Sequence, residues 1–536
     1  MKNKKNYING EIDFNELSLN PIIEKPNTNK NEIKVFQSMM QKAIKEEDLF
    51  RTLLEDTEKI DFELEANKKA VLNLREKLND ATDFKMKEAI EKEIQKKAPN
   101  EFEKYVMIIR QLLVLTEEKG FGMGISNGDF YFYNAEYWVK RDNEILTGFL
   151  GDFAEKCGLE NLQAQQFKVK DSLFKQFQIS APIPGFNSKI NEIRIPVENG
   201  TLILNGGKID LIGFKKEHFL KYKLNFKYDI NAKAVMFQAF LDRILPDKKL
   251  QNILLEFLGY VFVKDIKIEK MLLLFGFGSN GKSVINDIIY ALLGKQNMTN
   301  FSLSSLCNQK SQTRALIENT LLNFAQEIGN GKFEIDMLKT LVSNQPCESK
   351  LLYKNPFIIE NYGRFMFNCN TLPKNSENTN AFYRRFIILP FNETISDKEK
   401  DINLASKIIA NELPGVFNMV IDGMKRLRQQ GNFTKSEIVD KELEKYRRES
   451  SSILSFIDDE NYIPSPDSKM GLDIFYQIYR DYCTRNGFYP YQIKNLSAQL
   501  RNAGFEVKRS KNGFTNVFYA KLISDFSYDG ATIIKI

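Results

Sequence analysis

The spacing of apolar and polar positions divides the chain into segments of different type. Apolar residues recur every three or four positions from Ile60 to Leu78, within a Glu- and Lys-rich stretch from Ile33 to Lys97 that Pro99 ends. This spacing predicts a charged helical hairpin or a short coiled coil over residues 1–100. Acids and bases are interspersed along it, so we expect its charged face to be solvated surface rather than a DNA-binding arm.

A mixed pattern follows, in which one helix and several short strands are expected. The pattern predicts an α+β module over residues 101–250, because short aromatic and β-branched runs lie between turn signals such as Asn199-Gly200 and Gly206-Gly207. The predicted elements are a helix over Tyr105–Thr116 and strands over Phe130–Tyr133, Tyr137–Lys140, Thr201–Leu204 and Ile209–Gly213.

The apolar run Met271–Phe275 leads into the octapeptide GFGSNGKS, and a helical pattern over Val284–Leu293 follows it. A strand, a glycine-rich loop and a helix in this order are typical of a phosphate-binding loop, whose N–H groups and lysine hold phosphate oxygens while its Ser/Thr hydroxyl ligates Mg²⁺. A chance match in an ordinary loop is the alternative, and the strand and helix on either side disfavour it. We therefore predict ATP and Mg²⁺ as ligands, with candidate nucleotide-binding residues Gly276, Gly278, Ser279, Asn280, Gly281, Lys282 and Ser283.

Three further apolar runs end or begin at polar residues that an ATPase requires. The run Thr320–Ala325 ends at Gln326 and Glu327, and an acid at a strand tip is typical of the group that activates water and, with Ser283, holds Mg²⁺. Arg364–Cys369 ends at Asn370, whose amide is a candidate for orienting that water. Arg384 and Arg385 precede the run Phe386–Pro390 and are candidates for an arginine supplied to a neighbouring subunit. The alternatives are a solvated glutamate, a turn-forming asparagine and a surface arginine pair.

The last eighty or so residues have the pattern of a winged helix. Helices are expected over Leu472–Thr484 and Ile493–Ala503, followed by two strands around Lys511-Asn512-Gly513. The second helix and the wing would bring four cations towards phosphate, which makes DNA binding one interpretation and docking to a protein the other. These cations are Arg501, Lys508, Arg509 and Lys511.

Composition narrows the class of protein. A chain of 536 residues suggests about three or four domains. No apolar run has the length of a membrane span and the first residues lack an apolar core, so we expect a cytoplasmic protein that has no membrane partner. Five scattered cysteines and a single histidine, His218, give no zinc or disulfide pattern. The net charge of +6 permits a nucleic-acid partner without requiring one.

The ordered motifs GFGSNGKS, LLNFAQE, RFMFNCN and YRRFIILPF, with the flanking segments IPVENGTLIL and LLEFLGYVF, resemble superfamily 3 DNA helicases of the phage/plasmid and poxvirus primase-helicase branch. The resemblance covers roughly residues 105–522. It implies an AAA+ ATPase that forms a hexameric ring and unwinds DNA from three-prime to five-prime.

The resemblance also implies roles for individual residues. Lys282 and Ser283 match the family's phosphate-loop pair, Glu327 its strand-tip acid, Asn370 its sensor, and Arg384 or Arg385 its arginine finger. Gln326 departs from the pattern, because many relatives have two acids at this strand tip, and the geometry of the metal site is correspondingly less defined. Between these motifs the family has a hairpin that grips DNA in the ring channel. The residues of this chain that occupy the region are Lys339, Lys350, Tyr353 and Lys354, with Phe357 beside them.

These observations predict a multidomain α/β protein: a helical segment (1–100), an α+β module (101–250), an AAA+ P-loop ATPase core (251–430) and a helical connector with a winged helix (431–536). The expected function is an ATP-dependent ring helicase that replicates a phage, plasmid or integrated element in a bacterial host. Single-stranded and forked DNA, further copies of the chain and a separate primase or polymerase are the expected partners. Two alternatives stay open: an AAA+ ATPase that remodels protein assemblies, and a primase-helicase with a residual priming role.

Overall fold

The computed structural model describes residues 48–183, 192–308, 312–328, 333–351, 356–373, 380–510 and 513–521. The chain forms two compact units. One consists of Met1–Phe130 with Arg141–Ile183, and the other of Tyr131–Lys140 with Pro184–Ile536. The chain is thus a multidomain α/β protein, while its finer division into four domains stays a prediction.

The described part of the first unit is mainly helical. Asn100 begins α5 with a reciprocal cap, because its side chain accepts from the Glu103 N–H while the Glu103 carboxylate accepts from the Asn100 N–H. Leu74 of α3 packs with Ile90 and Ile94 of α4, the arrangement expected of a helical hairpin. The helices are α2 (Phe62–Ala66), α3 (Lys68–Asp80), α4 (Phe84–Lys96), α5 (Glu101–Glu118), α6 (Asn143–Lys156), α7 (Asn161–Ala164) and α8 (Phe167–Ser180).

Two small sheets come before the larger parallel sheet in the sequence. The strands β1 (Gly122–Ser126), β2 (Asp129–Tyr133) and β3 (Trp138–Arg141) form a sheet in that order. The strands β4 (Glu192–Val197), β5 (Gly200–Asn205) and β6 (Lys208–Ile212) form an antiparallel meander. The strands that the sequence predicts at 130–133, 201–204 and 209–213 lie at these positions, and the predicted helix at 105–116 lies within α5.

The second unit is built around a five-stranded sheet whose order is β13-β7-β12-β9-β8. Every neighbouring pair in it is parallel. Its strands are β7 (Met271–Phe275), β8 (Met298–Thr299), β9 (Leu322–Ala325), β12 (Arg364–Cys369) and β13 (Phe386–Pro390). Numbered along the chain, the strand order is therefore 5-1-4-3-2.

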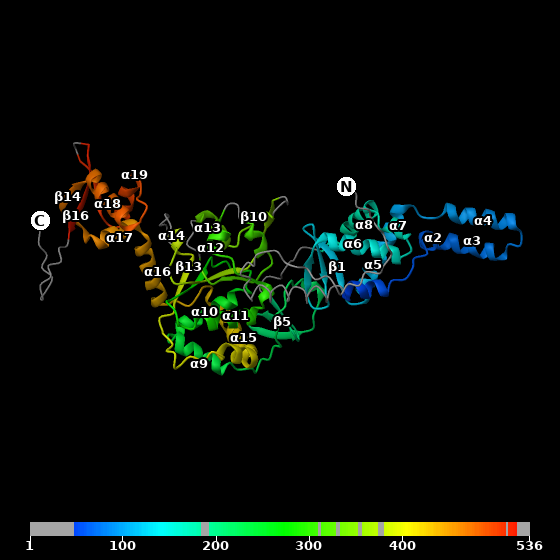
Figure 1. Cartoon of the computed structure of the whole chain (residues 1–536), viewed down its shortest axis with the longest axis horizontal. Coiled ribbons are helices and arrows are strands. Elements are labelled where there is room, and N and C mark those ends of the chain that lie inside the picture. The colour runs from blue at the N-terminus through cyan, green and yellow to red at the C-terminus, as the bar shows by residue number, and fades with distance from the viewer. Residues whose placement is uncertain are drawn as a thin grey trace, which may run out of the picture. The chain divides into compact units, whose positions relative to one another are not determined.

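Both faces of this sheet are covered, as expected for parallel strands (Figure 1). Leu272 and Leu274 of β7 belong to one core, with residues of α9 (Val235–Ile244), α10 (Lys248–Tyr260), α11 (Lys282–Leu293) and α15 (Leu404–Gln430). Met271 and Leu273, which point to the other face, belong to a second core with residues of α12 (Leu303–Leu306), α13 (Ile335–Val342) and α16 (Glu437–Ser450). A continuous apolar strand thus contributes alternate side chains to two cores.

Helices and short elements complete this unit. They are η1 (Lys216–His218), α9 (Val235–Ile244), α10 (Lys248–Tyr260), α11 (Lys282–Leu293), η2 (Lys295–Asn297), α12 (Leu303–Leu306), η3 (Thr313–Ile317), α13 (Ile335–Val342), β10 (Cys347–Ser349), β11 (Phe357–Ile359), α14 (Asn380–Tyr383), α15 (Leu404–Gln430) and α16 (Glu437–Ser450). The helices α10 and α15 cross closely at Gly423, where a Cβ atom would lie 2.6 Å from the carbonyl carbon of Leu255.

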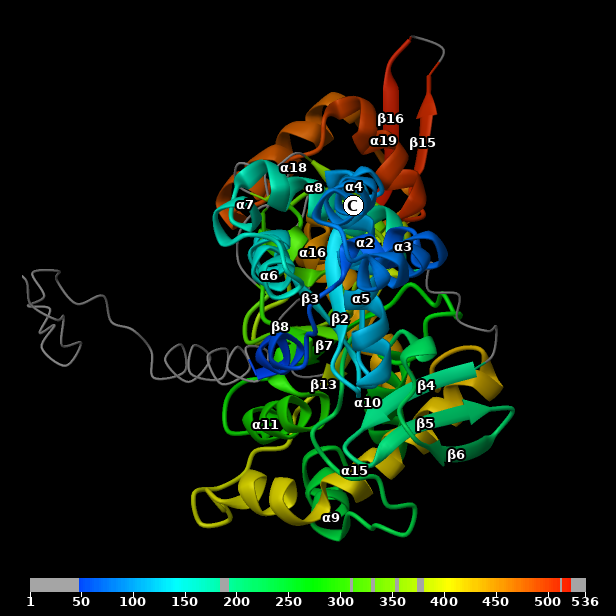
Figure 2. The same ribbon diagram turned by 90° about the vertical axis from the view of Figure 1, so that its right-hand side faces the viewer.

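The C-terminal part of the second unit has a core of its own, which includes Phe456, Phe475, Leu496 and Val517. Its elements are α17 (Ser452–Asp459), β14 (Tyr462–Gly471), α18 (Leu472–Asn486), α19 (Ile493–Asn502), β15 (Glu506–Arg509) and β16 (Thr515–Lys521). The sheet order is β14-β16-β15, and Figure 2 shows the β15–β16 pair beside α19. We call residues 452–521 the C-terminal module.

Among the helices that the structure describes, none is long and apolar enough to cross a membrane.

Candidate functional site

The loop between β7 and α11 has the backbone shape of a phosphate cradle. Gly278 (φ +44°), Ser279 (φ +45°) and Gly281 (φ +81°) all adopt left-handed conformations. Gly281 is the N-cap of α11, so the loop ends where the unpaired N–H groups of that helix begin. N–H groups at a helix N-terminus favour an anion, and a loop of this shape adds others to them.

Two glycines of the loop have no room for a side chain. A Cβ at Gly276 would lie 2.5 Å from the carbonyl oxygen of Phe391, and one at Gly281 would lie 2.8 Å from Cγ2 of Ile244. Gly281 therefore packs directly on α9, and Gly276 on the chain just after β13. Gly281 is thus required both by conformation and by close packing, Gly276 by close packing and Gly278 by conformation.

The side chain of Lys282 lies inside the loop. Lys282 is only 9 % exposed as a whole residue. Its Nζ donates to the carbonyl oxygen of Gly276 at 2.5 Å and to Oδ1 of Asn280 at 3.1 Å. Burial lowers the pKa of this ammonium group. An anionic phosphate would supply the opposite charge that the loop itself does not, so the residues present fit a bound nucleotide.

Asn280 ties the phosphate loop to the end of β13. It is buried, and its Nδ2 donates to the carbonyl oxygen of Phe391 at 3.1 Å while its Oδ1 accepts from Lys282. The N–H of Ile395 also donates to the carbonyl oxygen of Ser279 at 2.8 Å. These contacts support the loop and Lys282, while a role of Asn280 in nucleotide binding stays a prediction.

Glu327 and Asn370 lie at the same edge of the sheet as the loop. Phe275 of β7 pairs with Cys369 of β12, and Phe367 of β12 pairs with Ala325 of β9. Because these strands are parallel, their carboxyl ends share one edge, and Glu327 is two strands, or about 10 Å, from the loop. Glu327, Asn370 and Ser283 are all exposed. The carboxylate of Glu327 and the hydroxyl of Ser283 are oxygen ligands of the kind that Mg²⁺ prefers.

Gln326, the residue that departs from the family pattern, has a partner that sequence reasoning missed. Nδ2 of the buried Asn368 donates to Oε1 of Gln326 at 3.1 Å, across from β12 to the end of β9. An amide pair thus joins the two strand ends that carry Glu327 and Asn370. Asn368 is the one amide in the largely apolar β12, but only the strand order shows that its partner is Gln326.

The structure does not bring Arg384 and Arg385 near the phosphate loop of their own chain. They precede β13, whose start lies beside the start of β7: the Met271 N–H donates to the carbonyl oxygen of Arg385 at 2.8 Å. The loop follows the other end of β7, roughly 15 Å away along the strand. The predicted arginines and the predicted loop therefore lie at opposite edges of one sheet.

The two arginines differ in exposure. The Arg385 side chain is 7 % exposed and donates to Oγ of Ser343 at 3.5 Å and to the carbonyl oxygen of Ala381. The Arg384 side chain is 64 % exposed, with Glu269 at 3.5 Å. Arg385 is thus held inside its own subunit, whereas the guanidinium of Arg384 is available to another molecule.

A hairpin lies between the second and third motifs. β10 and β11 pair antiparallel, with Ser349 opposite Phe357, and the exposed Lys350 follows β10 directly. Tyr353 and Lys354, also predicted to contact DNA, lie outside the described residues. Lys339 is not on this hairpin, because it belongs to α13, where its Nζ bonds Asp336 at 3.1 Å. The apolar residues of α13 are buried, and the helix ends before the hairpin begins. These residues are Leu338, Leu341 and Val342.

The predicted cations of the C-terminal module are exposed but have contacts within the module. Nη2 of Arg501 donates to the carbonyl oxygen of Val507 at 3.2 Å, and Nε of Arg509 donates to that of Gly513 at 3.2 Å. Lys508 forms an ion pair with Glu506. Lys511 lies outside the described residues. Lys494, the second residue of α19, is a further exposed cation, and its spacing of seven from Arg501 places both on one face of the helix.

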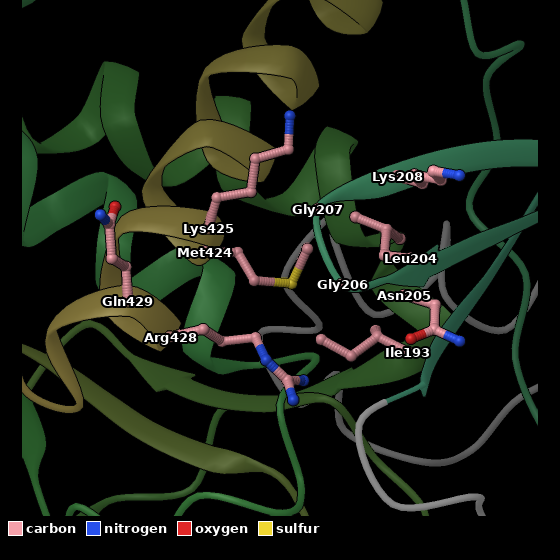
Figure 3. A pocket seen from close by; sticks show the side chains of 10 residues that line it. All are labelled: Ile193, Leu204, Asn205, Gly206, Gly207, Lys208, Met424, Lys425, Arg428 and Gln429. Atoms are coloured by element: carbon pink, nitrogen blue, oxygen red, sulfur yellow. The ribbon is translucent and has the colours of Figure 1, made fainter.

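The second unit also contains a cavity of about 520 Å³ between the β4–β6 meander and α15 (Figure 3). Its lining includes apolar side chains and the cations Lys208, Lys425 and Arg428. None of its lining residues is a predicted site residue, so this cavity is separate from the phosphate loop.

Comparison with known families gives two matches. Residues 107–246 match the model described as D5 N terminal like, and residues 274–385 match a family of unknown function, DUF5906. The second match contains the phosphate loop, Glu327, Asn370, Arg384 and Arg385. The comparison with curated proteins gave no match.

Among solved structures, the chain is similar to the A form apo structure of the NrS-1 C terminal region. The identity is 13 %, the TM-score is 0.44, and the match covers 76 % of this chain and 98 % of that one. A second structure of the same region, residues 305–718, gives 13 % identity, a TM-score of 0.43 and coverage of 77 % and 99 %.

Proposed function

We propose that this chain is an ATP-dependent DNA helicase that assembles into a ring and acts in the replication of a phage, plasmid or integrated element. The observation that carries the proposal is the division of its candidate residues between two edges of one sheet. The loop that contains Lys282 lies at one edge, together with Glu327 and Asn370 from two other strand ends. The exposed Arg384 lies at the other edge. A site divided in this way is complete only where two subunits meet head to tail.

The core of this helicase would be an AAA+ ATPase. The parallel strand order 5-1-4-3-2, with the phosphate loop after the first strand and Glu327 after the third, supports this assignment. The match of residues 107–246 to the D5 N terminal like model supports a place among phage and viral replication proteins. Six subunits and three-prime to five-prime movement are taken from the resemblance to superfamily 3.

Each side chain would then have a defined role in hydrolysis. Water attacks the γ-phosphorus, the bond from this phosphorus to the β–γ bridging oxygen breaks, and Glu327 accepts a proton from the water. Asn370 orients the water, Lys282 holds the β- and γ-phosphate oxygens, and Arg384 of the neighbouring subunit stabilises the charge that develops. Mg²⁺, held by Ser283 and through the carboxylate of Glu327, would neutralise phosphate charge.

DNA would be held at two places. The β10–β11 hairpin with Lys350 would contact phosphates of a single strand without reading its sequence, which is the contact that a translocating motor requires. The C-terminal module would act as a winged helix on duplex or forked DNA. Its order of helix, strand, two helices and two strands, with the sheet order β14-β16-β15, supports this part of the proposal.

The proposal is tested by mixing two inactive variants. Lys282→Ala lacks the phosphate lysine but retains the finger, and Arg384→Ala lacks the finger but retains the phosphate lysine. Each alone should hydrolyse ATP about 10²-fold or more slowly than the unchanged protein in the presence of single-stranded DNA. In an equimolar mixture roughly a quarter of the interfaces join an intact loop to an intact finger, so hydrolysis should return to a comparable fraction.

The control is a mixture in which no interface can be complete. Lys282→Ala is mixed with the double variant Lys282→Ala/Arg384→Ala, and this mixture should stay inactive. Equal rates in the two mixtures would show that the arginine does not act across the interface. Hydrolysis that is indifferent to DNA, from an otherwise active oligomer, would remove the helicase assignment.

That last outcome would favour a second candidate, an AAA+ ATPase that remodels protein assemblies. The observation in its favour is that the C-terminal module exposes Tyr489 (73 %) and Phe514 (69 %) beside cations that already have partners within the module. Exposed aromatic side chains are typical of protein docking surfaces as well as of stacking sites for bases.

A further inference from the structure

The helix α16 joins the ATPase sheet to the C-terminal module, and one tyrosine of this helix is part of the ATPase core. Tyr446 is 2 % exposed and belongs to the core that covers the sheet face formed by Met271, Leu273 and Phe367. The helix ends at Ser450, and α17 of the C-terminal module begins two residues later. Tyr446 therefore lies in the helix that connects the sheet to the module, packed against the sheet.

The hydroxyl of Tyr446 contacts the loop that follows β12. It donates to the carbonyl oxygen of Pro373 at 2.6 Å, a short bond between buried groups. Pro373 is three residues beyond Asn370, so this hydrogen bond holds the other end of the short segment that carries the candidate sensor.

The ring of Tyr446 contacts the turn that carries the candidate finger. It packs edge-on against Tyr383, with ring centroids 5.4 Å apart, and against Phe386, with centroids 5.8 Å apart. Arg384 stands between these two residues in the sequence. One side chain of α16 thus fixes the loop of Asn370 through its hydroxyl and the turn of Arg384 through its ring.

The last residue of α16 and one residue of the C-terminal module lie beside the same cluster. Ser450, buried at the end of α16, hydrogen-bonds with both Tyr383 and Tyr446. Tyr491, from the segment that enters α19, is close enough to Tyr383 to interact with it electrostatically. Burial raises the pKa of Tyr446 well above its ordinary value, so its hydroxyl keeps its proton and remains a donor at any physiological pH.

We propose that Tyr446 is a positioning residue of the ATPase site, which sets Asn370 and Arg384 according to the position of the C-terminal module. The inference rests on the proposed function. A nucleic acid bound to the module would act through α16 on both the sensor of its own subunit and the finger that this subunit presents to its neighbour. Because Tyr446 contacts both the Asn370 loop and the Arg384 turn, it would link DNA binding to hydrolysis in each subunit.

The test uses the full chain and the substitution Tyr446→Phe, which keeps the packing ring and removes only the hydroxyl. We expect kcat for ATP in the presence of DNA to fall about tenfold, equivalent to about 1.4 kcal/mol of activation free energy. ATP affinity, measured directly with a fluorescent nucleotide, should be unchanged, because the phosphate loop does not contact Tyr446. A change confined to kcat is the signature of a group that acts only in the transition state.

A double variant identifies the residue through which Tyr446 acts. Tyr446→Phe combined with Asn370→Ala should be no slower than Asn370→Ala alone, since the hydroxyl acts through the Asn370 loop. Rate losses that multiply would overturn the inference. The matched control is Tyr222→Phe, which also removes a tyrosine hydroxyl bonded to a backbone carbonyl, that of Arg194 at 3.3 Å, but from a residue that packs on the other core. It should hydrolyse ATP normally.

The outcomes separate this inference from the proposed function. If the unchanged protein hydrolyses ATP with DNA stimulation and Tyr446→Phe does so equally well, the positioning role is wrong and the helicase assignment stands. An equal loss in Tyr222→Phe would also overturn the positioning role, because the effect would then be one of general stability. If the unchanged protein does not hydrolyse ATP, both proposals fail together.

Discussion

The phosphate loop and the wing of the C-terminal module use lysine and arginine in opposite ways. At the loop, Lys282 is buried, bonded to two oxygens of its own loop and held by a backbone in which Gly278 and Gly281 have positive φ. At the wing, Lys508 and Arg509 are exposed on a two-stranded ribbon. One region fixes a single cation in one place, and the other offers several cations to solvent.

Because of this difference, we expect the two regions to respond differently to amino-acid substitutions. A buried cation in a shaped loop acts through position, so one substitution should remove the function of the loop altogether. Exposed cations act through their summed charge, so each substitution should weaken binding by a modest step that depends on salt.

The largest effect is expected for Lys282→Met, which keeps the length of the side chain and removes its charge. ATP hydrolysis should fall at least about 10²-fold, because the interaction with phosphate oxygens is lost. Turnover and nucleotide binding are the measurements. Lys400→Met, a change of the same kind at an exposed ion pair with Asp397, should hydrolyse ATP normally.

The same variant tests the burial of the charge. Because burial lowers the folded-state pKa of Lys282 below 10.5, the ligand-free folded state binds fewer protons than the unfolded state at alkaline pH. This group therefore makes the protein more stable as the pH rises from the folded pKa towards 10.5. Urea unfolding across this range should show a smaller rise in Lys282→Met than in the unchanged protein, and an equal rise would mean that Lys282 is solvated.

A smaller effect, on stability, is expected for two alanine substitutions in the loop. Gly278 and Gly281 both have positive φ, but only at Gly281 would a Cβ meet other atoms, Ile244 at 2.8 Å and Phe240 at 3.0 Å. Gly278→Ala should destabilise the protein by about 1 kcal/mol through backbone conformation alone. Gly281→Ala adds a clash with α9 and should cost about 2–4 kcal/mol in urea unfolding. Equal losses would show that packing on α9 does not shape the loop.

The smallest effect is expected for Lys508→Ala and Arg509→Ala in the wing. Each should weaken binding to duplex DNA only several-fold and reduce the slope of log affinity against log salt by about 0.9. Fluorescence anisotropy at several salt concentrations is the measurement. A double variant that binds DNA with an unchanged slope would show that the wing does not contact phosphate, and would move the C-terminal module towards protein docking.

Part of the fold could be predicted because the signals are local. The loop, its preceding strand and its following helix are contiguous, and β7, β12 and β13 begin and end where their apolar runs do. By contrast, β14 was missed. It contains Pro464 and Pro466, which argue against a strand, and it is formed at the edge of its sheet, with a register irregularity between Ile463 and Ser468.

The sequence by itself determined which residues are candidates: a glycine loop with Lys282 and Ser283, an acid and an amide at strand ends, and an arginine pair before a strand. Only the tertiary structure decided how they relate. Strand order places Asn368 beside Gln326. Packing buries the side chain of Arg385 and leaves that of Arg384 exposed. The position of α16 brings the hydroxyl of Tyr446 to the carbonyl oxygen of Pro373. Loop chemistry depends on neighbours in sequence, whereas exposure and long-range contacts depend on which elements the folded core brings together.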